Sequence, residues 1–273
     1  MGINGTTELY GIMGNPVAHS LSPAMHNGAF TALGLNKAYL PFAVQDVAQA
    51  MSGLRALGIK GVSVTIPHKQ AVMEYLDTID PVAEKIGAVN TLVINNGAIH
   101  GANTDWLGAN RALGEKISLN GASVLLLGAG GSARAIGFGL LEAGASLTIA
   151  SRTPEKGQAL AQLLGCPWLP LAEAGTVKAK ALVNATSMGM GSQQDLLPIA
   201  KEALANFQVV MDIVYAPLAT RLLQEAEKAG CQTIDGLAML LYQGAAQFEL
   251  WTGQQAPVEV MRQSLLTSLG YNP

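Results

Sequence analysis

The chain has 273 residues, of which 13% are charged and 49% are hydrophobic. It is therefore long enough for two folded domains and too apolar to be intrinsically disordered. The formal net charge of -3 excludes the broad basic surface that is typical of nucleic-acid-binding proteins. The two cysteines, Cys166 and Cys231, predict neither a disulfide framework nor a metal site.

The sequence also bears on location. No apolar run approaches the roughly 18 residues that a membrane-spanning helix needs. The N-terminus lacks the basic start and apolar middle of a signal peptide. We therefore expect a cytoplasmic protein with reduced thiols and no membrane partner.

The N-terminal part of the chain alternates predicted strands with predicted helices. In chain order, the patterns predict a strand at 9–13, a helix at 23–33, a strand at 39–43, a helix at 47–57, a strand at 61–66 and a mostly helical stretch at 70–86 with a break at Pro81. Two further strands, 89–94 and 98–102, flank Asn95-Asn96-Gly97, which is a hairpin signal. Strands that alternate with helices predict a mainly parallel sheet.

A second α/β block opens after residues 103–105. The patterns predict a helix at 106–113 and strands at 124–127, 147–150, 181–183 and 209–214, with helices between the strands. Helical sequence then dominates 237–251 and 258–269. The two blocks together predict an α/β fold with two domains.

A glycine-rich loop follows the first strand of the second block. The apolar run 124–127 leads into Gly128, Gly130 and Gly131 and then into a predicted helix. Glycines let the backbone approach a ligand closely, and the unpaired N–H groups of the first helical turn attract a pyrophosphate. The loop therefore predicts a nucleotide site, with a glycine turn that binds nothing as the alternative.

The end of the next strand indicates which nucleotide binds. An NAD site usually has an acidic residue about 20 positions after the loop, whereas strand 147–150 ends in Ser151-Arg152-Thr153. Arg152 and Lys156 can pair with a 2′-phosphate, which favours NADP over NAD. Arg152 could instead lie on a solvated surface, and Thr153 could either donate a hydrogen bond to the cofactor or cap the next helix.

Polar residues of the first block lie at predicted strand ends and loops, where binding sites tend to be found. Ser20 and Ser22 can both face a polyhydroxylated ligand, although Ser22 is also a good N-cap for a helix that begins at Pro23. Lys69 follows a parallel strand at the edge where such sheets bind ligands, although many lysines in such positions are simply exposed. Asn90 lies near the end of a predicted strand and could bind a ligand, although a role in a turn or a helix cap would also explain it.

Taken together, these segments resemble one family. The successive motifs are GNPVAHSLSP (14–23), VTIPHK (64–69), GAVNTL (87–92), GANTD (101–105), GAGGSA (128–133), SRT (151–153), NATSMG (184–189), DIVY (212–215) and DGLAMLLYQ (235–243). In this order they are similar to the motifs of shikimate dehydrogenases, and they extend from about residue 10 to residue 251.

The resemblance implies a fold and a reaction. It implies an N-terminal α/β substrate domain of residues 1–104, completed by 236–273, and a Rossmann-like NADP-binding domain of residues 105–235, with a cleft between them. It also implies NADPH-dependent, reversible reduction of 3-dehydroshikimate to shikimate in aromatic amino-acid biosynthesis. The implied partner is a small-molecule substrate, and both a monomer and a homodimer are compatible with the sequence.

The resemblance also implies site residues. The shikimate-binding residues would be Ser20, Ser22, Thr65, Lys69, Asn90, Asp105, Tyr215 and Gln243. The cofactor-binding residues would be Gly128, Ala129, Gly130, Gly131, Ser132, Ser151, Arg152, Thr153, Lys156, Ile213 and Gly236. Lys69 would be the catalytic acid and base, and Asp105 would orient it.

Three residues depart from the usual family pattern, namely Ser63, Ala102 and Trp106. None of them replaces an expected catalytic group, but Trp106 could narrow the site. Two alternatives of the same class are a quinate/shikimate dehydrogenase and an aminoshikimate dehydrogenase. An alternative of another class is a catalytically idle NADP-binding regulator. The joint presence of Lys69, Asp105, Asn90 and Gln243 argues against it.

Overall fold

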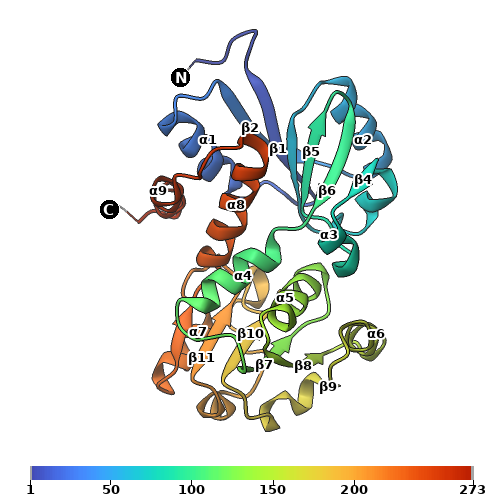
Figure 1. Cartoon of the computed structure of the whole chain (residues 1–273). Helices are drawn as coiled ribbons and strands as arrows, with labels where there is room; N and C mark the ends of the chain where they lie inside the picture. The colour runs from blue at the N-terminus through green and yellow to red at the C-terminus, as the bar shows by residue number, and fades with distance from the viewer. Residues whose placement is uncertain (1, 272–273) are drawn as a thin grey trace. The chain divides into compact units, whose positions relative to one another are not determined.

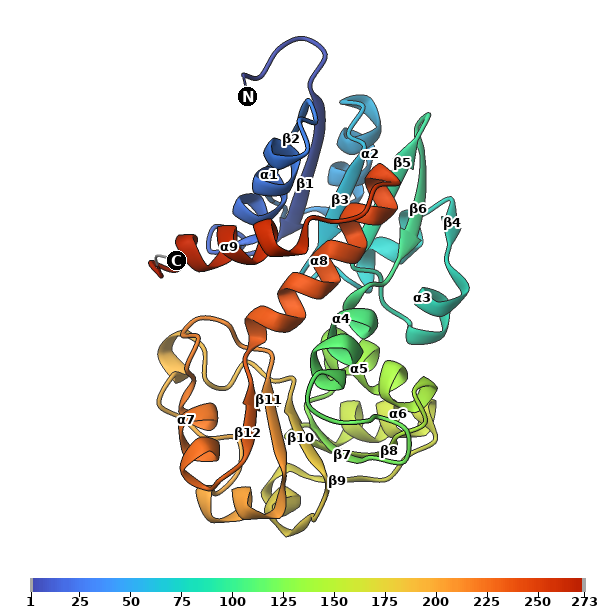
Figure 2. The same ribbon diagram turned by 60° about the vertical axis from the view of Figure 1, so that its left-hand side comes forward.

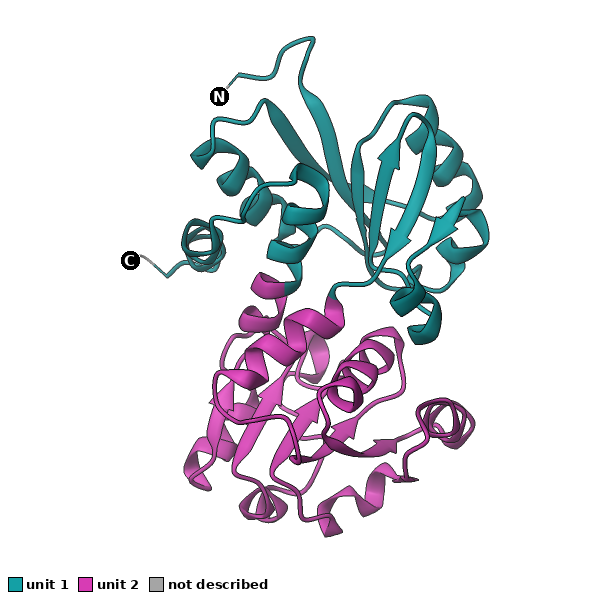
Figure 3. Ribbon diagram, in the orientation of Figure 1, with its two compact units in different colours: residues 1–104, 243–273 teal, residues 105–242 magenta. Residues whose placement is uncertain are grey.

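The computed structural model of the protein describes residues 2–271. The chain divides into two compact units (Figure 3). Unit 1 comprises residues up to Thr104 and from Gln243 onward, and unit 2 comprises Asp105–Tyr242. The second boundary falls inside a continuous helix, α8 (Gly236–Thr252), whereas the sequence motifs place the return to the first domain at residue 236.

Unit 1 is built on a mixed sheet. Within the described residues its strand order is β2-β1-β3-β5-β6-β4 (Figure 1; β3 is labelled in Figure 2). The elements are β1 (Glu8–Gly14), α1 (Ser22–Ala32), β2 (Lys37–Ala43), α2 (Val47–Ala56), β3 (Gly61–Val64), the 3₁₀ helix η1 (Ala71–Tyr75), β4 (Thr78–Ile79), α3 (Pro81–Ile86), β5 (Thr91–Asn95), β6 (Ala98–Ala102) and, near the C-terminus, α9 (Val258–Ser268). The β1, β2 and β3 strands run parallel, and β5 is antiparallel to both β3 and β6.

The predicted hairpin is present and has the expected turn chemistry. Asn96 and Gly97 both have positive φ, at 51° and 82°, between the paired residues Asn95 and Ala98. Two consecutive positive φ angles match the right-handed twist of a two-residue hairpin, and an Asn-Gly pair adopts them readily. The turn residues therefore set the register of β5 against β6.

The predicted helical stretch at 70–86 is wrong in its middle part. The chain forms η1, then β4 at the sheet edge, and only then α3. Asp77 accepts a hydrogen bond from the Ile99 amide at 2.7 Å, which draws the segment against β6. Asp80 then caps α3, since its side chain accepts from the Val82 amide at 2.8 Å.

Unit 2 contains a parallel sheet of Rossmann order. Within the described residues the strands follow one another as β12-β11-β10-β7-β8-β9 (Figure 2). The elements are α4 (Asp105–Gly114), β7 (Ser123–Leu127), α5 (Gly131–Glu142), β8 (Ser146–Ser151), α6 (Pro154–Leu164), β9 (Trp168–Pro170), the 3₁₀ helix η2 (Leu171–Thr176), β10 (Ala181–Asn184), the 3₁₀ helices η3 (Gly191–Gln193) and η4 (Lys201–Asn206), β11 (Val209–Asp212), α7 (Arg221–Lys228) and β12 (Gln232–Ile234). The order reverses between β7 and β10, the position at which sheets of this kind bind nucleotides. The predicted α/β fold is confirmed.

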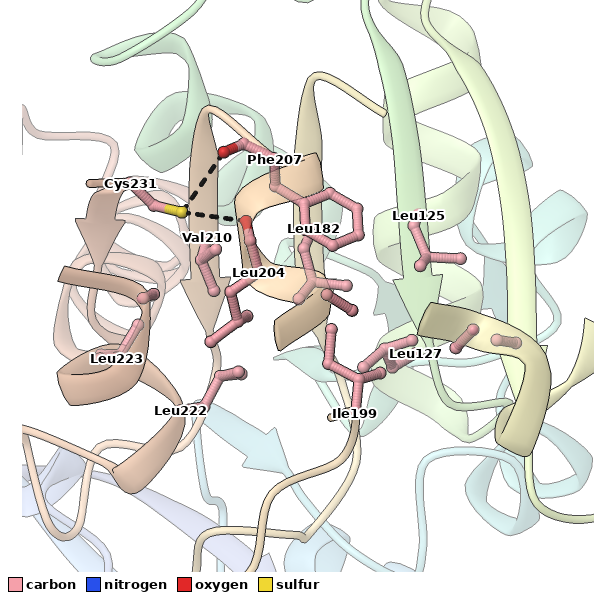
Figure 4. Packing of buried hydrophobic residues seen from close by; sticks show 14 residues of the cluster. Leu125, Leu127, Leu182, Ile199, Leu204, Phe207, Val210, Leu222, Leu223 and Cys231 are labelled. Atoms are coloured by element: carbon pink, nitrogen blue, oxygen red, sulfur yellow. Dashed lines mark hydrogen bonds between the residues drawn. The ribbon is translucent and has the colours of Figure 1, made fainter. Parts of the chain in front are cut away.

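Apolar residues from the strands and surrounding helices fill the core of unit 2 (Figure 4). Leu125 and Leu182, from neighbouring strands, are fully buried there. Cys231 lies in the same cluster, where its Sγ atom contacts the Leu204 and Phe207 carbonyl oxygens, each at 3.3 Å. Burial raises the pKa of this thiol, and both Cys166 and Cys231 are free cysteines.

Membrane-spanning helices and clusters of metal-binding side chains are both absent from the described residues. Within residues 2–271, no helix is long and apolar enough to cross a membrane. Over the same residues, no group of three or more His, Cys, Asp or Glu side chains is arranged to hold a metal ion.

Candidate functional site

The glycine loop lies at the topological switch point of unit 2. Gly128 has a φ of 116°, and a Cβ atom placed there would lie 2.8 Å from the carbonyl oxygen of Ala185. Ala185 follows β10, the strand that neighbours β7 on the side where the order reverses. Only glycine fits this conformation and this close approach, so the first glycine of the motif is required by the fold.

The loop leads into the N-terminus of α5. Gly130 occupies the N-cap position and makes no side-chain cap hydrogen bond, and a Cβ atom there would meet open space. The first-turn amides, which belong to Gly131, Ser132 and Ala133, therefore have no side chain capping them. Such a helix start, next to a close backbone approach at Gly128 and Ala129, fits a pyrophosphate.

The residues after β8 line a pocket of about 400 Å³ within unit 2. Its lining includes Ser151, the last residue of β8, with Arg152, Pro170 and Leu171. The Ser151 hydroxyl accepts a hydrogen bond from the Trp168 indole at 2.9 Å and donates one to the Thr153 carbonyl at 3.1 Å, which fixes the strand end. The mostly apolar lining and the guanidinium fit an adenosine that carries a 2′-phosphate.

Of the alternatives for Thr153 and Arg152, the structure bears on the one for Thr153. Thr153 stands at the N-cap position of α6, but its side chain makes no cap hydrogen bond. Arg152 and Lys156 are both exposed, in the turn before α6 and in its first turn. Both cations are therefore accessible to a charged ligand, and the Thr153 hydroxyl is not used as a cap.

Unit 2 contains a buried carboxylate that is not among the site residues predicted from the sequence. Asp212, at the end of β11, is fully buried and accepts hydrogen bonds from Asn184 at 3.0 Å, from the Val214 amide at 3.0 Å and from Thr220 at 2.8 Å. Burial raises the pKa of Asp212 to about 6, although the three hydrogen bonds oppose this shift. Asn184 directly follows the predicted strand 181–183, and Asp212 lies within the next predicted strand, 209–214; these polar residues were the signal that could have found the cluster.

This cluster fixes the loop that contains two predicted site residues. The Ile213 amide donates to the Asn184 carbonyl at 3.1 Å. A Cβ atom at Gly236 would overlap the carbonyl of Ile213, so these two predicted nicotinamide neighbours lie against each other. Tyr215 follows in the same loop, and burial raises the pKa of its phenol.

In unit 1, the two predicted serines differ in surroundings. Ser20 is partly buried, and its hydroxyl accepts a hydrogen bond from the Ser22 amide at 3.3 Å. Ser22 is 3% exposed and is the first residue of α1, with Leu21 at the N-cap position. The N-cap interpretation of Ser22 is therefore wrong, because the helix begins one residue earlier than Pro23 predicts.

Thr65 and Lys69 follow β3 on a short, well-fixed segment. The Thr65 amide donates to the Met13 carbonyl at 2.9 Å, and its own carbonyl accepts from the His68 amide at 2.9 Å. The Lys69 carbonyl accepts from the Val89 amide at 2.8 Å. The backbone that carries Lys69 is thereby tied to the segment immediately before Asn90.

Asn90 lies at the centre of a buried polar group in unit 1. It is 2% exposed, and its side-chain oxygen accepts from the Thr104 amide at 2.8 Å. Its side-chain nitrogen donates to the Thr104 hydroxyl at 3.0 Å and to the Gln243 side-chain oxygen at 3.3 Å. The structure therefore brings Asn90 and Gln243 together, although they are 153 positions apart.

Asp105 is the first residue of α4, in unit 2, and is 4% exposed. The pairing of Lys69 with Asp105 and the cleft between the domains remain predictions.

Comparison with known proteins identifies the family of the chain. The family model for the shikimate dehydrogenase substrate binding domain matches residues 12–92, and the model for the shikimate 5′-dehydrogenase C-terminal domain matches residues 236–266. The NADP⁺-dependent shikimate dehydrogenase of Methanothermobacter thermautotrophicus is 46% identical, over 96% of this chain and 97% of its own length. The chain belongs to the shikimate dehydrogenase family. The family predicted from the sequence motifs is thus confirmed.

Solved structures extend the agreement to the whole fold. A crystal structure of shikimate dehydrogenase in complex with NADP⁺ matches with a TM-score of 0.92 and 41% identity, covering 98% of this chain and 97% of that one. The enzyme of Thermus thermophilus, in complex with NADP(H) and shikimate, matches with a TM-score of 0.89 and 39% identity, covering 96% and 99%. The predictions of an oxidoreductase and of NADP as its cofactor are confirmed.

Proposed function

We propose that this chain catalyses the reversible, NADPH-dependent reduction of 3-dehydroshikimate to shikimate, a step of aromatic amino-acid biosynthesis. The proposal depends mainly on one observation. In this chain, which belongs to the shikimate dehydrogenase family, uncharged polar side chains surround Asn90 and Gln243. Amides and hydroxyls recognise a polyhydroxylated ring without a fixed charge, and they reject a substrate that leaves them unpaired.

In unit 2, the residues present fit NADP. Gly128, Ala129 and the first turn of α5, from Gly131 to Ser132, would hold the pyrophosphate. Arg152, with Ser151, Thr153 and Lys156 beside it, would hold the 2′-phosphate. Ile213 and Gly236 would lie near the nicotinamide. When bound, the cofactor supplies the hydride.

In unit 1, Lys69 would manage the proton. Its ammonium group would polarise the substrate carbonyl and donate a proton to the oxygen as the alcohol forms, and the neutral amine would accept that proton in the oxidising direction. Asp105 would orient Lys69 and accept a hydrogen bond from the substrate hydroxyl.

The remaining residues would orient the substrate. Ser20 and Ser22 would bind the carboxylate with neutral hydroxyls, and Tyr215 would add a third. Thr65, Asn90 and Gln243 would contact the ring hydroxyls. This arrangement favours shikimate over quinate, which differs at the ring carbon that bears the carboxylate.

The test is an assay of the purified protein with NADP⁺, in which the absorbance of NADPH is followed with shikimate, quinate or aminoshikimate as substrate. Turnover that is fastest with shikimate supports the proposal. Faster turnover of quinate or aminoshikimate would assign the chain to one of those sister activities. Tight NADP⁺ binding without turnover of any substrate would favour the regulatory protein.

We further expect the enzyme to act in the cytoplasm as a monomer or a homodimer. Sedimentation of the purified chain distinguishes the two assemblies.

A further inference from the structure

A line of polar contacts joins α8 to the strands of unit 1. Gln243, Gln247 and Trp251 lie four residues apart on α8, and side chains at this spacing share one helix face. Gln243 contacts the Asn90 side chain, and the Trp251 indole donates to the Leu92 carbonyl at 2.9 Å. We call these contacts, with those of Gln247 between them, the α8 seam.

Gln247 makes the central contacts of the seam. Its side-chain nitrogen donates to the Asn90 carbonyl at 3.0 Å and to the Thr91 hydroxyl at 3.0 Å. Its side-chain oxygen accepts from the Ser63 hydroxyl at 2.7 Å. Gln247 is 1% exposed and Ser63 is 5% exposed, so an unmade hydrogen bond here would be costly.

The donors and acceptors of the seam permit one arrangement only. The Asn90 carbonyl cannot donate, so the Gln247 amino group must face it and the Gln247 oxygen must face Ser63. The single hydroxyl hydrogen of Ser63 is then used in the hydrogen bond that it donates to Gln247. The Tyr39 hydroxyl, 2.6 Å from the Ser63 oxygen, must therefore donate to Ser63.

The order of hydrogen-bond donors and acceptors continues from Gln247 to the predicted substrate-binding residues Asn90 and Gln243. The Thr91 hydroxyl accepts from Gln247 and donates to the Asn90 side-chain oxygen at 2.7 Å. The Asn90 amino group consequently faces the oxygen of Gln243. The edge of Gln243 that points away from Asn90 is thus its amino group, a donor.

We propose that Ser63 and Gln247 are positioning residues of the substrate site. The hydrogen bonds of the α8 seam fix how far α8 is shifted along its axis and how it is rotated about that axis, and so fix the position of Gln243. They also fix the orientation of the Asn90 side-chain amide. Neither residue needs to touch the substrate. The inference deepens the proposed function and rests on it for the identity of the ligand. It also gives a role to Ser63, at which the chain departs from the usual family pattern.

Gln247→Leu and Ser63→Ala test the proposal. The first variant removes the whole central contact at nearly constant volume, and the second removes only the link to β3. Because a hydrogen bond contributes about 0.5–1.5 kcal/mol, we expect KM for shikimate to rise about three- to tenfold in Ser63→Ala and further in Gln247→Leu. The kcat value and KM for NADP⁺ should change less than about twofold.

Two matched variants serve as controls. Ser52→Ala removes a hydroxyl that bonds within α2 of the same unit, to the Ala48 carbonyl at 3.2 Å, and should leave KM unchanged. Ser63→Thr keeps the hydroxyl and should restore KM toward the wild-type value. A merely structural role would lower the melting temperature and the active fraction, and so the apparent kcat, without raising KM.

Calorimetric titration of each protein with shikimate separates the two proposals. An unchanged Kd and KM in both Ser63→Ala and Gln247→Leu would overturn the positioning role even if the wild type is fully active. A wild type that binds shikimate without turnover would overturn the proposed reaction, and the Kd values of the variants would then decide the positioning role. A wild type that does not bind shikimate would overturn both.

Discussion

The two units bury polar groups of different kinds. In unit 1, the α8 seam consists of amides, hydroxyls and an indole, all neutral, and burial raises the pKa of Tyr39 further above its ordinary value. In unit 2, the buried cluster is centred on the carboxyl group of Asp212. The cofactor site that we propose for unit 2 would also rely on charge, through Arg152 and the N-terminus of α5.

The difference matches what each unit has to recognise. The hydroxyl groups of a polyhydroxylated ring are selected by hydrogen bonds that are lost when the wrong substrate leaves a buried amide unpaired. A phosphorylated cofactor is selected by cations and helix ends, whose attraction for anions weakens with salt. The comparison therefore predicts separate determinants of substrate and of cofactor preference, one set in each unit.

The largest expected effect belongs to Lys69→Ala. Loss of a general acid and base should lower kcat by about 10²–10⁴-fold, while KM for shikimate changes little. Lys60 is the matched control, since it precedes β3 whereas Lys69 follows it, and Lys60→Ala should remain active. A near-normal kcat in Lys69→Ala, measured at saturating shikimate and NADP⁺, would remove the lysine from the mechanism.

The next effect in size concerns the cofactor. Arg152→Ala removes charge-assisted hydrogen bonds worth about 1.5–3 kcal/mol, so KM for NADP⁺ should rise about 10–100-fold. KM for NAD⁺ and for shikimate should change little. Arg221, which pairs with Glu225 on α7, provides a control substitution to alanine. Equal losses for NADP⁺ and NAD⁺ would refute a contact with the 2′-phosphate.

The two units should contribute to the pH dependence of stability with opposite signs. In unit 1, His26 is fully buried, stacks on Tyr39 at 4.5 Å, and has its pKa lowered by burial to about 3. The unfolded chain takes up this proton as the pH falls through about 6.5, whereas the folded chain does not, so stability falls toward acid. His26→Phe should abolish a loss of about 2 kcal/mol between about pH 7.5 and about pH 5 in urea unfolding. An unchanged acid slope would show that His26 is not the group responsible.

Asp212 in unit 2 should change the free energy of unfolding with pH in the opposite direction to His26, and by a smaller amount. Its folded pKa, about 6, lies above the ordinary 3.8, so the folded state takes up a proton first and gains stability as the pH falls through about 6. Asp212→Asn should remove a gain of about 1.4 kcal/mol between about pH 7.5 and about pH 5. The exposed Asp195, changed to Asn, should leave the slope as it is. A steeper acid gain in Asp212→Asn would contradict the assignment.

Local patterns were sufficient for much of the fold. The glycines from Gly128 onward, the hairpin at Asn96-Gly97 and the Ser151-Arg152 strand end each depend on a few neighbouring residues, and the structure contains the expected loop, turn and strand end. The two-domain α/β class followed from the alternation of strands and helices. Short edge strands such as β9 and β12 were missed, because three residues give too little periodicity.

Features that depend on distant partners escaped prediction. The segment 70–86 changes from helix to edge strand because Asp77 bonds to Ile99 across the sheet. Ser63 and Gln247 are 184 positions apart, so no local pattern could pair them. The same holds for Asp212, whose cluster joins the ends of two strands and the start of a helix.

The separation of determinants is tested most directly by measuring kcat/KM for shikimate and for quinate, each with NADP⁺ and with NAD⁺. The account predicts the highest value for shikimate with NADP⁺. It also predicts the same preference for shikimate over quinate with either cofactor, since independent sites contribute additively to the free energy. A substrate preference that disappears or reverses when NADP⁺ is replaced by NAD⁺ would contradict it.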